Sequence, residues 1–420
     1  NEDIYDLIEN ADLDPDQELH LLDRLASDER LAGTLRDDER FELELRRARL
    51  RCVCGDWDGS REQYLAVAEE SRRLGAPDVL TRVALEIDDR GRSVRLVGPR
   101  LGLLEEARRR FGDRGDAGRR IELDAAWAGE VNQFGRGDSA VAGESLVAFS
   151  DEVVARARAL GDPGVLAAAL FTRQSVGHWK GDVAGNRRLL DELLELAAAR
   201  GDDHLLHVGL LGRLRAGIQA GDRDDAEAYR ERHEALAEAT RHPRTTWFAM
   251  MQRSTLAQMD GRFEEAQLLA IDGAGYGAEK AIPDADGAFK AALYFNLFHA
   301  RATGEVRALV EDVVVAEPHN PLWRIGAGIA QVESGDEEAA AASLAAVVEW
   351  IPRLPRNEFW PSVLVMSADL ASRLPPDPDR AAFLADLLAP WAGRFVVMGS
   401  MITTLGPADR ALALLAREQG

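Results

Sequence analysis

Two histidines lie three residues apart in the stretch GDDHLLH, where His204 and His207 follow Asp202 and Asp203. On a helix this spacing puts both imidazoles on one face, and with a ligand from another helix they could hold a metal ion. The start of a helix, however, favours acidic residues and tolerates histidines that face solvent. We therefore interpret the stretch as a helix start with solvent-facing histidines and expect no metal ion.

The two cysteines form a C-x-C pair, Cys52 and Cys54, in RCVCGDW. Residues two apart on a helix point away from each other, and two cysteines cannot form a disulfide framework. The pair also lacks a third and fourth ligand at the spacing of a zinc site. We interpret both residues as small buried hydrophobic residues in a reducing cytoplasm.

The motifs of common catalytic sites are missing from the sequence. It has no phosphate-binding G-x-x-x-x-G-K-[ST] loop, no G-x-S-x-G and no H-E-x-x-H. Acidic pairs are frequent, but among 73 Asp and Glu residues their adjacency indicates solvated helix faces with Arg at helical spacing. The sequence therefore predicts a protein that is not an enzyme and needs no cofactor.

The chain is strongly acidic, with 51 Lys and Arg against 73 Asp and Glu and a net charge of -22. Such a surface repels a phosphate backbone, so we expect no nucleic acid partner. No apolar run approaches the roughly 20 residues of a membrane helix, and the start at Asn1 carries no basic and apolar leader. We expect a cytoplasmic segment of a longer protein with no membrane partner.

Short glycine-containing turns indicate the elements that any site would depend on. Six of them follow one another at steps of 20 residues: Gly161-Asp162, Gly181-Asp182, Gly201-Asp202, Gly221-Asp222, RHPR at 241–244 and Gly261-Arg262. This spacing fits one helix and one turn, so it is an internal repeat.

The tripeptide Arg-Gly-Asp, present at 114–116, 136–138 and 200–202, has a structural explanation in the same turns. Arg is favoured in the last turn of a helix, Gly in the left-handed position after it, and Asp at the N-cap of the next helix. The copy at 114–116 lies off the 20-residue spacing. We therefore interpret the tripeptides as turns rather than adhesion ligands.

Between the turns, apolar residues follow a helical period, as in Leu206, Leu210, Leu214 and Ile218, and alternating strand patterns are missing. Two helices make a unit of about 40 residues. The second helix carries a small residue five positions after its turn glycine, which permits close helix packing. These residues are Ala142, Ala226, Ala266 and Ala340, with Ser60 and Asn186 as departures. The sequence predicts an all-α, right-handed superhelical solenoid of helical hairpins.

No linker rich in Ser, Gly or Pro divides the chain, so we expect a single α-solenoid domain over residues 1–420. Residues 1–40, with helix starts at DPDQE and SDER, are expected to be capping helices. Residues 41–130 are expected to form irregular helical hairpins with a loop near 87–102. The repeats should fill 131–420, with the turn spacing lengthening to 43 residues at Gly304 and then 31 at Gly335.

Stretches such as GDRDDAEAY and GRFEEAQLLA resemble the tetratricopeptide repeat (TPR), so the repeats are TPR-like. The stretches at 242–270, 316–344 and 387–416 resemble the C-terminal helical-repeat segment of large bacterial ATP-binding regulators of the LuxR type and of related nucleotide cyclases. In that family a nucleotide-binding switch module precedes the repeats. The resemblance implies a regulatory segment that contacts an upstream ATPase module; the DNA-binding domain with which the activators continue is not in this sequence.

The first helix of each unit is expected to line the concave side of the solenoid, and several of these helices carry Arg and aromatic residues. The candidate ligand-binding residues are Arg213, Trp247, Arg253, Tyr294, His299 and Trp323, with Arg215 and Arg324 beside them. Such a groove suits an apolar or sugar-like effector or a peptide. Taken singly, however, large aromatic residues on a helix more often belong to the core between repeats.

Two functions are compatible with these patterns. The first is a non-catalytic sensor domain of a bacterial transcriptional regulator, where a small-molecule effector or protein partner bound in the groove controls an ATPase switch. The alternative is a protein–protein interaction scaffold that senses no small molecule.

Overall fold

The computed structural model describes residues 13–28, 30, 33–87, 99–111, 116–134, 142–283 and 285–419. The chain divides into two units, unit 1 with residues 1–92 and 97–127 and unit 2 with residues 93–96 and 128–420. The single domain over 1–420 stays a prediction.

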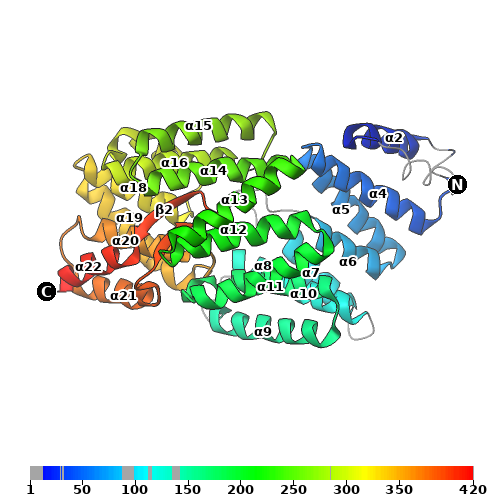
Figure 1. Ribbon diagram of the computed structural model, residues 1–420, viewed down its shortest axis with the longest axis horizontal. Coiled ribbons are helices and arrows are strands. Elements are labelled where there is room, and N and C mark those ends of the chain that lie inside the picture. The colour runs from blue at the N-terminus through cyan, green and yellow to red at the C-terminus, as the bar shows by residue number, and fades with distance from the viewer. Residues whose placement is uncertain are drawn as a thin grey trace. The chain divides into compact units, whose positions relative to one another are not determined.

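Unit 1 is helical. It contains α2 (Pro15–Ser27), α4 (Asp37–Val53), α5 (Trp57–Leu74), α6 (Pro77–Glu86), α7 (Pro99–Phe111) and the first part of α8 (Ala117–Phe134) (Figure 1). From α4 to α7 each helix packs against the next, around buried residues that include Leu45, Leu80 and Leu104.

Two sequence predictions fall in unit 1. The helix start at DPDQE is confirmed, because Asp14 caps α2 by accepting from Gln17 N and the Gln17 side chain accepts from Asp14 N. Of the second start, SDER, residue 29 lies outside the described residues. Of the predicted loop near 87–102, residues 99–102 are helical, because α7 begins at Pro99, and residues 88–98 lie outside the described part.

Unit 2 is a series of consecutive helices. They are α9 (Ala142–Leu160), α10 (Pro163–Val176), α11 (Val183–Arg200), α12 (Asp203–Gln219), α13 (Arg223–Thr240), α14 (Pro243–Met259), α15 (Phe263–Glu279), α16 (Ala285–Ala300), α17 (Arg307–Ala316), α18 (Pro321–Glu333), α19 (Glu337–Trp350), α20 (Trp360–Ala371), α21 (Pro378–Leu388) and α22 (Ala408–Gln419). Short 3-10 helices are η3 (His178–Lys180), η4 (Thr303–Val306), η5 (Ile351–Arg353) and η6 (Ala389–Trp391). From α9 to α16, and again from α17 to α22, each helix packs against the next, which confirms an all-α solenoid.

The 20-residue spacing is confirmed and extends further than the glycines indicate. Left-handed backbone occurs at Gly161, Gly181, Gly201, Gly221 and Gly261, and also at Arg241, Ala281 and Arg301, with φ of 51°, 49° and 57° for these last three. The spacing therefore continues unbroken from 161 to 301, and the predicted turn at Gly304 is wrong, since Gly304 lies in η4. The turn at Arg241 was predicted from RHPR, whereas the turns at Ala281 and Arg301 were missed because neither contains glycine at the left-handed position.

The predicted caps are confirmed where the structure describes them. Asp162, Asp182, Asp202 and Asp222 each accept a hydrogen bond from a backbone N–H in the first turn of the helix that follows. In the tripeptide at 200–202, Arg200 ends α11, Gly201 is left-handed and Asp202 caps α12. The tripeptide at 136–138 and the first two residues of the copy at 114–116 lie outside the described residues.

The small residues of the second helices are at close helix contacts. Ala226, Ala266 and Ala340 are fully buried, whereas the side chain of Ala142 lies outside the described part. A Cβ atom at Gly217 on α12 would lie 2.8 Å from Ala226 N on α13, so the two backbones touch. At the departure Ser60, the hydroxyl donates to Ala48 O at 2.7 Å, which satisfies a buried polar group.

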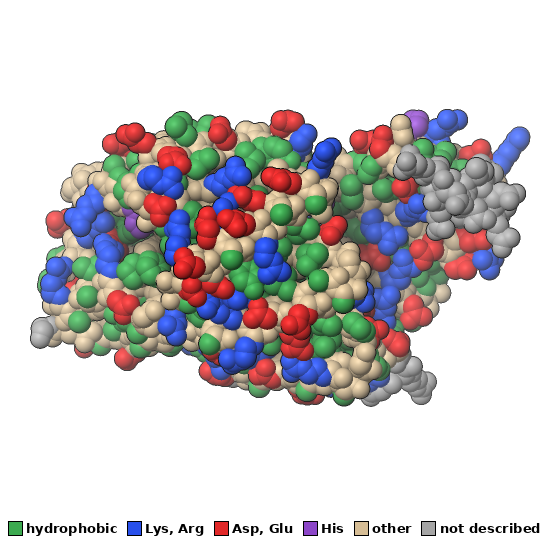
Figure 2. All heavy atoms as spheres, viewed as in Figure 1, with side chains coloured by type: hydrophobic (Ala, Val, Ile, Leu, Met, Phe, Trp, Pro, Cys, Tyr) green, Lys and Arg blue, Asp and Glu red, His purple; other side chains and the backbone are tan. Residues whose placement is uncertain are grey.

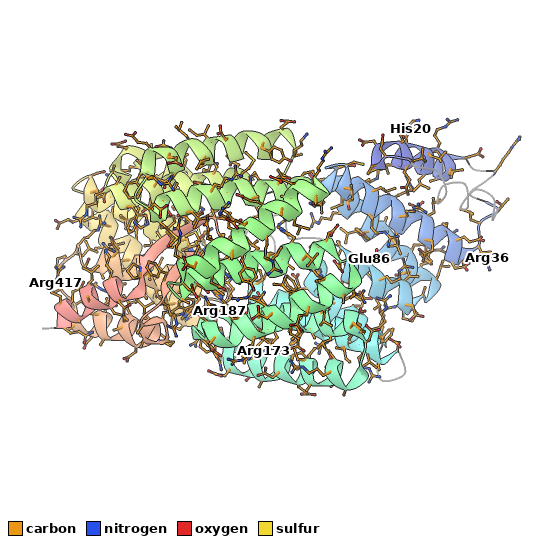
Figure 3. All side chains as sticks on the ribbon, viewed as in Figure 1. His20, Arg36, Glu86, Arg173, Arg187 and Arg417 are labelled. Carbon is orange, nitrogen blue, oxygen red and sulfur yellow. The ribbon has the colours of Figure 1, made fainter. Side chains whose placement is uncertain are left out.

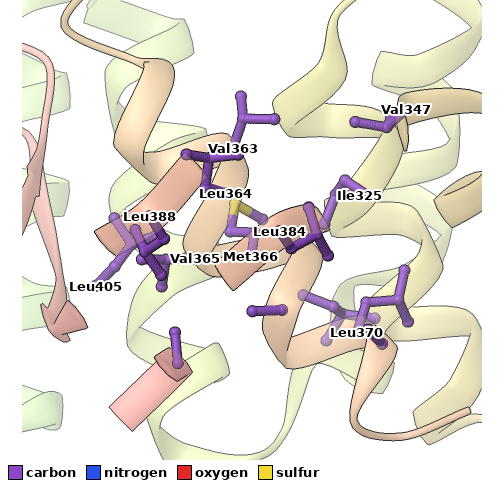
Figure 4. Packing of buried hydrophobic residues seen from close by; sticks show 14 of the residues in the cluster. Ile325, Val347, Val363, Leu364, Val365, Met366, Leu370, Leu384, Leu388 and Leu405 are labelled. Atoms are coloured by element: carbon purple, nitrogen blue, oxygen red, sulfur yellow. The ribbon is translucent and has the colours of Figure 1, made fainter. Parts of the chain in front are cut away.

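A β-hairpin interrupts the helices and was not predicted. Strands β1 (Phe395–Met398) and β2 (Thr403–Pro407) pair antiparallel, with a register shift after Val396. The apolar run FVVM is typical of a strand that is buried on both faces. Val397 packs with helices α12 and α14, while Val396 and Leu405 belong to the core around α20; Figure 4 shows Leu405 beside Leu388 and Val365.

The surface of the chain mixes charges of both signs. Figure 2 shows acidic and basic side chains interspersed over the visible face. Within the described ranges, no helix is both long enough and apolar enough to cross a membrane.

Candidate functional site

The hairpin lies on the alternate helices of unit 2. Strand β1 packs against α12 and α20, and β2 packs against α14, α16, α20 and α22. Figure 1 shows β2, near the C-terminal end of the chain, among the helices α12 to α16. The face that the first helices of the repeats were expected to present to a ligand therefore holds a segment of the same chain.

Side chains of these helices bind main-chain atoms of the hairpin. Arg215 Nη1 donates to Gly399 O at 3.4 Å, and Thr255 Oγ1 donates to Met401 O at 2.8 Å. Gln258 Oε1 accepts from Thr404 N at 3.0 Å. Contacts of this kind depend on backbone position rather than on residue type.

His299 on α16 also binds a main-chain atom of the hairpin. Its Nε2 lies 2.8 Å from Thr404 O, and because a carbonyl oxygen only accepts, Nε2 carries the proton. Burial lowers the pKa of His299, which favours the neutral ring. Two of the helices thus hold both main-chain polar groups of Thr404, its N–H through Gln258 on α14 and its C=O through His299 on α16.

Four residues that bond to the hairpin, together with four polar residues at equivalent helix ends, form a set that we call the polar ladder. They occupy the last two turns of α12, α14 and α16 and the end of α10 with η3: Gln174, His178, Arg215, Gln219, Thr255, Gln258, Asn296 and His299. All are buried except His299, which is half-buried. Their sequence separation is close to the repeat length, so equivalent helix ends supply them.

Hydrogen bonds connect one step of the ladder to the next. Arg215 Nη2 donates to Gln174 Oε1 at 3.2 Å, 41 residues away. Gln219 Nε2 lies 3.3 Å from His178 Nε2, also 41 residues away. A third pair joins Gln258 Nε2 to Asn296 Oδ1 at 3.0 Å. These bonds join α10 and η3 to α12, and α14 to α16, so members of the ladder in neighbouring repeats support one another.

The ladder is almost free of net charge. Arg215 is its one permanently charged member, and Glu358 neutralises it at 3.0 Å. Burial, with the nearby Arg215 as a smaller cause, lowers the pKa of His178 well below its ordinary value, so this ring is neutral. A buried, uncharged row of donors and acceptors suits peptide groups better than ionised ligands.

Two buried side chains anchor the C-terminal segment. Trp391 in η6 donates from Nε1 to Trp179 O at 3.1 Å, and its ring lies 5.3 Å from the ring of His178. Met401, at the hairpin tip, is completely buried in the cluster that contains Leu214 and adopts φ of 70°. Left-handed backbone is unusual for a non-glycine residue, so the surrounding contacts hold this tip in place.

The residues predicted to bind a ligand are dispersed. Arg213 is buried and pairs with Asp191 at 2.6 Å and Asp225 at 3.2 Å, which links α11, α12 and α13. Trp247 is buried beside Phe248. Arg253 is exposed and pairs with Glu234 at 2.7 Å.

Three further predicted residues lie near the C-terminal core of unit 2. Tyr294 is buried and donates to Gly326 O at 3.0 Å, and Trp323 packs edge-on against its ring at 6.3 Å. Only His299, of the six, bonds to the hairpin. The structure thus brings Tyr294 and Trp323 together but does not gather the six residues around one site, and their role in binding a ligand stays a prediction.

Most of the polar ladder was not predicted from the sequence. Arg215 and His299 were among the predicted groove residues, but Gln174, Gln219, Thr255, Gln258 and Asn296 carry no charge and no aromatic ring. A usable signal was present, because uncharged polar residues recur near the ends of otherwise apolar helices at intervals close to 40 residues.

The residues weighed as metal ligands have other partners. His207 is buried, so the prediction that it faces solvent is wrong. Its Nδ1 lies 2.7 Å from His233 Nε2, and Gln252 Nε2 lies 3.2 Å from the other nitrogen of His233. Burial lowers the pKa of His207 to about 2 and that of His233 to about 4. In the part of the chain that the structure describes, no group of three or more His, Cys, Asp or Glu could hold a metal ion.

The cysteines at the end of α4 are half-buried rather than buried. Burial, with a hydrogen bond to Asp16, raises the pKa of Cys54 to about 11. This thiol stays protonated at neutral pH, which makes it a poor nucleophile.

Comparison with known proteins identifies no family. No protein-family model matches the chain, and no curated protein matches it. Among solved structures, it is similar to a circular tandem repeat protein with novel repeat topology and enhanced subunit contact surfaces, at 15% identity over 96% of this chain and 94% of that chain, with a TM-score of 0.16. Because that score is low, the solenoid assignment depends on the helices of this chain alone.

Proposed function

We propose that this chain is a non-catalytic repeat domain that binds an extended polypeptide along the polar ladder. One observation carries the proposal: side chains from three successive repeats bond to main-chain atoms of residues 399–404. An extended segment of another protein offers the same N–H and C=O groups, so the ladder can bind it in the same way.

A small-molecule effector is the weaker candidate. Arg213, Trp247 and Tyr294, three of the residues expected to contact it, are buried in contacts with neighbouring helices. The hairpin also covers the helix face on which the effector was expected. These contacts favour a polypeptide ligand.

The wider setting that we propose comes from the sequence resemblance. In it the chain is the repeat segment of a bacterial ATP-binding regulator of the LuxR type in the cytoplasm. The bound polypeptide would belong to an upstream ATPase module or to another protein, and binding would change the activity of that module.

The proposal can be tested by selecting random peptides against the full chain and against its Met401→Ala variant, in which the anchor of the hairpin is shortened. We expect peptides whose affinity, measured by fluorescence anisotropy, falls at least tenfold on Gln258→Leu. The matched control is Gln331→Leu, because Gln331 bonds to Glu311 and Ser343 on neighbouring helices instead of the hairpin. Selection of no peptide by either protein, or equal losses in both glutamine variants, would reject the proposal.

A further inference from the structure

We infer that the hairpin is an exchangeable occupant of the polar ladder, and that the partner replacing it is an uncharged, extended segment of another protein with one long apolar anchor. This inference rests on the proposed function, and it adds the chemistry of the ligand and the means of control. It follows from where the hairpin is anchored, how its tip is held and which of its atoms the ladder contacts.

The anchors of the C-terminal segment lie outside the hairpin. On one side, Trp391 is bonded to Trp179 O. On the other, Arg410 Nη2 on α22 donates to the buried Asp369 on α20 at 2.7 Å. Residues between these two points can leave the ladder while η6 and α22 stay bound.

Two glycines with left-handed backbone lie near the ends of the hairpin, Gly393 before β1 and Gly406 within β2. Gly393 and Gly406 have φ of 71° and 83°, conformations that favour glycine. Among the described residues, no atom of the surroundings lies within 4 Å of the position a Cβ would take at either glycine. Space is therefore available around both positions, and release of the hairpin at its first end must break the exposed bonds that Gly393 N donates to the Asp409 carboxylate at 3.0 and 3.1 Å.

The hairpin tip is held by contacts that exist only when it is seated. Met401 has left-handed backbone although it is not glycine, whereas the nearby left-handed position, with φ of 55°, is occupied by Gly399. Thr255 donates to Met401 O, and the Met401 side chain is completely buried. Release relaxes the backbone conformation of Met401, which offsets part of the loss of contacts.

The ladder specifies what can take the place of the hairpin. Thr255 and His299 need carbonyl groups as acceptors, and Gln258 Oε1 needs an N–H. The site of Met401 needs a long, flexible apolar side chain. Since the ladder has almost no net charge, an incoming charged residue would lose its hydration without a partner. The fitting ligand is therefore an uncharged extended segment.

Hydrogen exchange on the full chain tests exchangeability without any variant. We expect the backbone amides of residues 395–407 to exchange faster than those of α12 and α14, because the hairpin opens separately from the helices. Exchange of all three at one common rate would show that the hairpin opens only with global unfolding, and would overturn the inference.

A binding experiment then tests competition. The probe is a fluorescent synthetic peptide with the sequence FVVMGSMITTLGP of residues 395–407. We expect it to bind Met401→Ala at least tenfold more tightly than the unchanged chain, because the variant leaves the ladder open more of the time. The control is Leu344→Ala, an equally buried position on α19, which should behave like the unchanged chain. If Met401→Ala does not fold, as judged by circular dichroism, Thr403→Val loosens the hairpin by removing its side-chain bond to Gln258.

The outcomes separate the two proposals. Tighter binding by the loosened variant alone supports the inference. Equal binding by the variant and the unchanged chain would refute competition but leave polypeptide binding in place. No binding to either, with exchange showing that the hairpin is open, would reject both.

Discussion

The polar ladder and the ion pairs between the odd-numbered helices of unit 2 repeat at similar intervals but differ in chemistry. The ladder is buried and almost uncharged. The ion pairs join Arg to an acid on the next odd helix, as in Arg158–Glu192 at 2.6 Å and Arg187–Asp225 at 2.9 Å, and they are partly exposed. Figure 3 marks Arg187 on α11.

The two kinds of contact differ in how much each contributes to the free energy of unfolding. Exposed ion pairs contribute about 0–1 kcal/mol each, and salt weakens them. A buried polar group left without its partner costs about 1–3 kcal/mol. We conclude that the ion pairs of the odd helices add individually weak contacts between neighbouring repeats, whereas the even helices hold the hairpin by a few contacts that are costly to break.

The largest effect is expected at the anchor of the C-terminal segment. Trp391→Ala removes a fully buried ring and its bond to Trp179 O, and should lower the free energy of unfolding by about 3–5 kcal/mol. Trp323→Ala, at a half-buried position, is the comparison and should cost less. Urea unfolding followed by circular dichroism measures both, and equal losses would contradict a special role of this anchor.

Alanine substitutions at two turn glycines, only one of which contacts the C-terminal segment, measure how much that contact contributes to stability. Gly181 and Gly201 have almost the same φ, 65° and 64°. A Cβ at Gly181 would lie 2.5 Å from Pro390 O, whereas at Gly201 nothing among the described atoms lies within 4 Å. Gly201→Ala should cost about 1–2 kcal/mol, from backbone strain alone. Gly181→Ala should cost about 1–3 kcal/mol more, because Pro390 must move. Equal thermal shifts in the two variants would show that this contact contributes nothing.

The buried histidine pair predicts a pH dependence that the ion pairs cannot produce. Burial lowers the pKa of His233 to about 4 from an ordinary 6.5, so as pH falls the unfolded chain takes up the proton first. The neutral His233 therefore contributes roughly 3 kcal/mol to the free energy of unfolding. This contribution is complete above pH 6.5 and is lost as the pH falls towards 4. His233→Gln should reduce the fall in unfolding free energy between pH 6.5 and 5, where paired carboxylates remain ionised in both states. An unchanged pH profile would contradict a neutral native His233.

A single ladder bond gives a smaller effect. Thr255→Val keeps the shape of the side chain but leaves Met401 O without its donor, which should cost about 1–2 kcal/mol. Thr240→Val is the matched control, because the Thr240 hydroxyl donates within its own helix, to Leu236 O at 2.9 Å. Chemical denaturation of the two variants distinguishes them, and equal costs would show that the ladder bond is no stronger than a local one.

The helical repeat was predictable because its causes are local. Asp caps such as Asp202 and left-handed glycines such as Gly201 act within one turn of chain, so the residue types reveal them. Regularity was lost only where Ala281 and Arg301 adopt the same backbone without glycine. There, backbone hydrogen bonds that close the helix end, from Ile282 N to Gly277 O and from Ala302 N to Leu297 O, accompany a conformation that local preference disfavours.

The site was far less predictable because its causes are distant in sequence. Thr255 and Met401 are 146 residues apart, and nothing in either neighbourhood indicates the other. The predicted site residues are mostly Arg and aromatic residues, which in this fold serve mainly helix packing, as at Arg213 and Trp247. Neutral polar residues in the core were the better signal, since each of them needs a partner.

The smallest effect is expected at Arg253, which was predicted to bind a ligand and which forms a partly exposed ion pair between the neighbouring helices α14 and α13. Arg253→Gln removes its pair with Glu234, which keeps a second partner in Arg230. The loss should be below about 0.5 kcal/mol at low salt and should vanish at high salt. Arg213→Gln is the counterpart, because this buried side chain serves two acids, and its larger loss should persist in salt. Urea unfolding of both variants at two salt concentrations is the measurement. A large, salt-independent loss of unfolding free energy in Arg253→Gln would show that this exposed ion pair contributes as much as the buried pairs of Arg213.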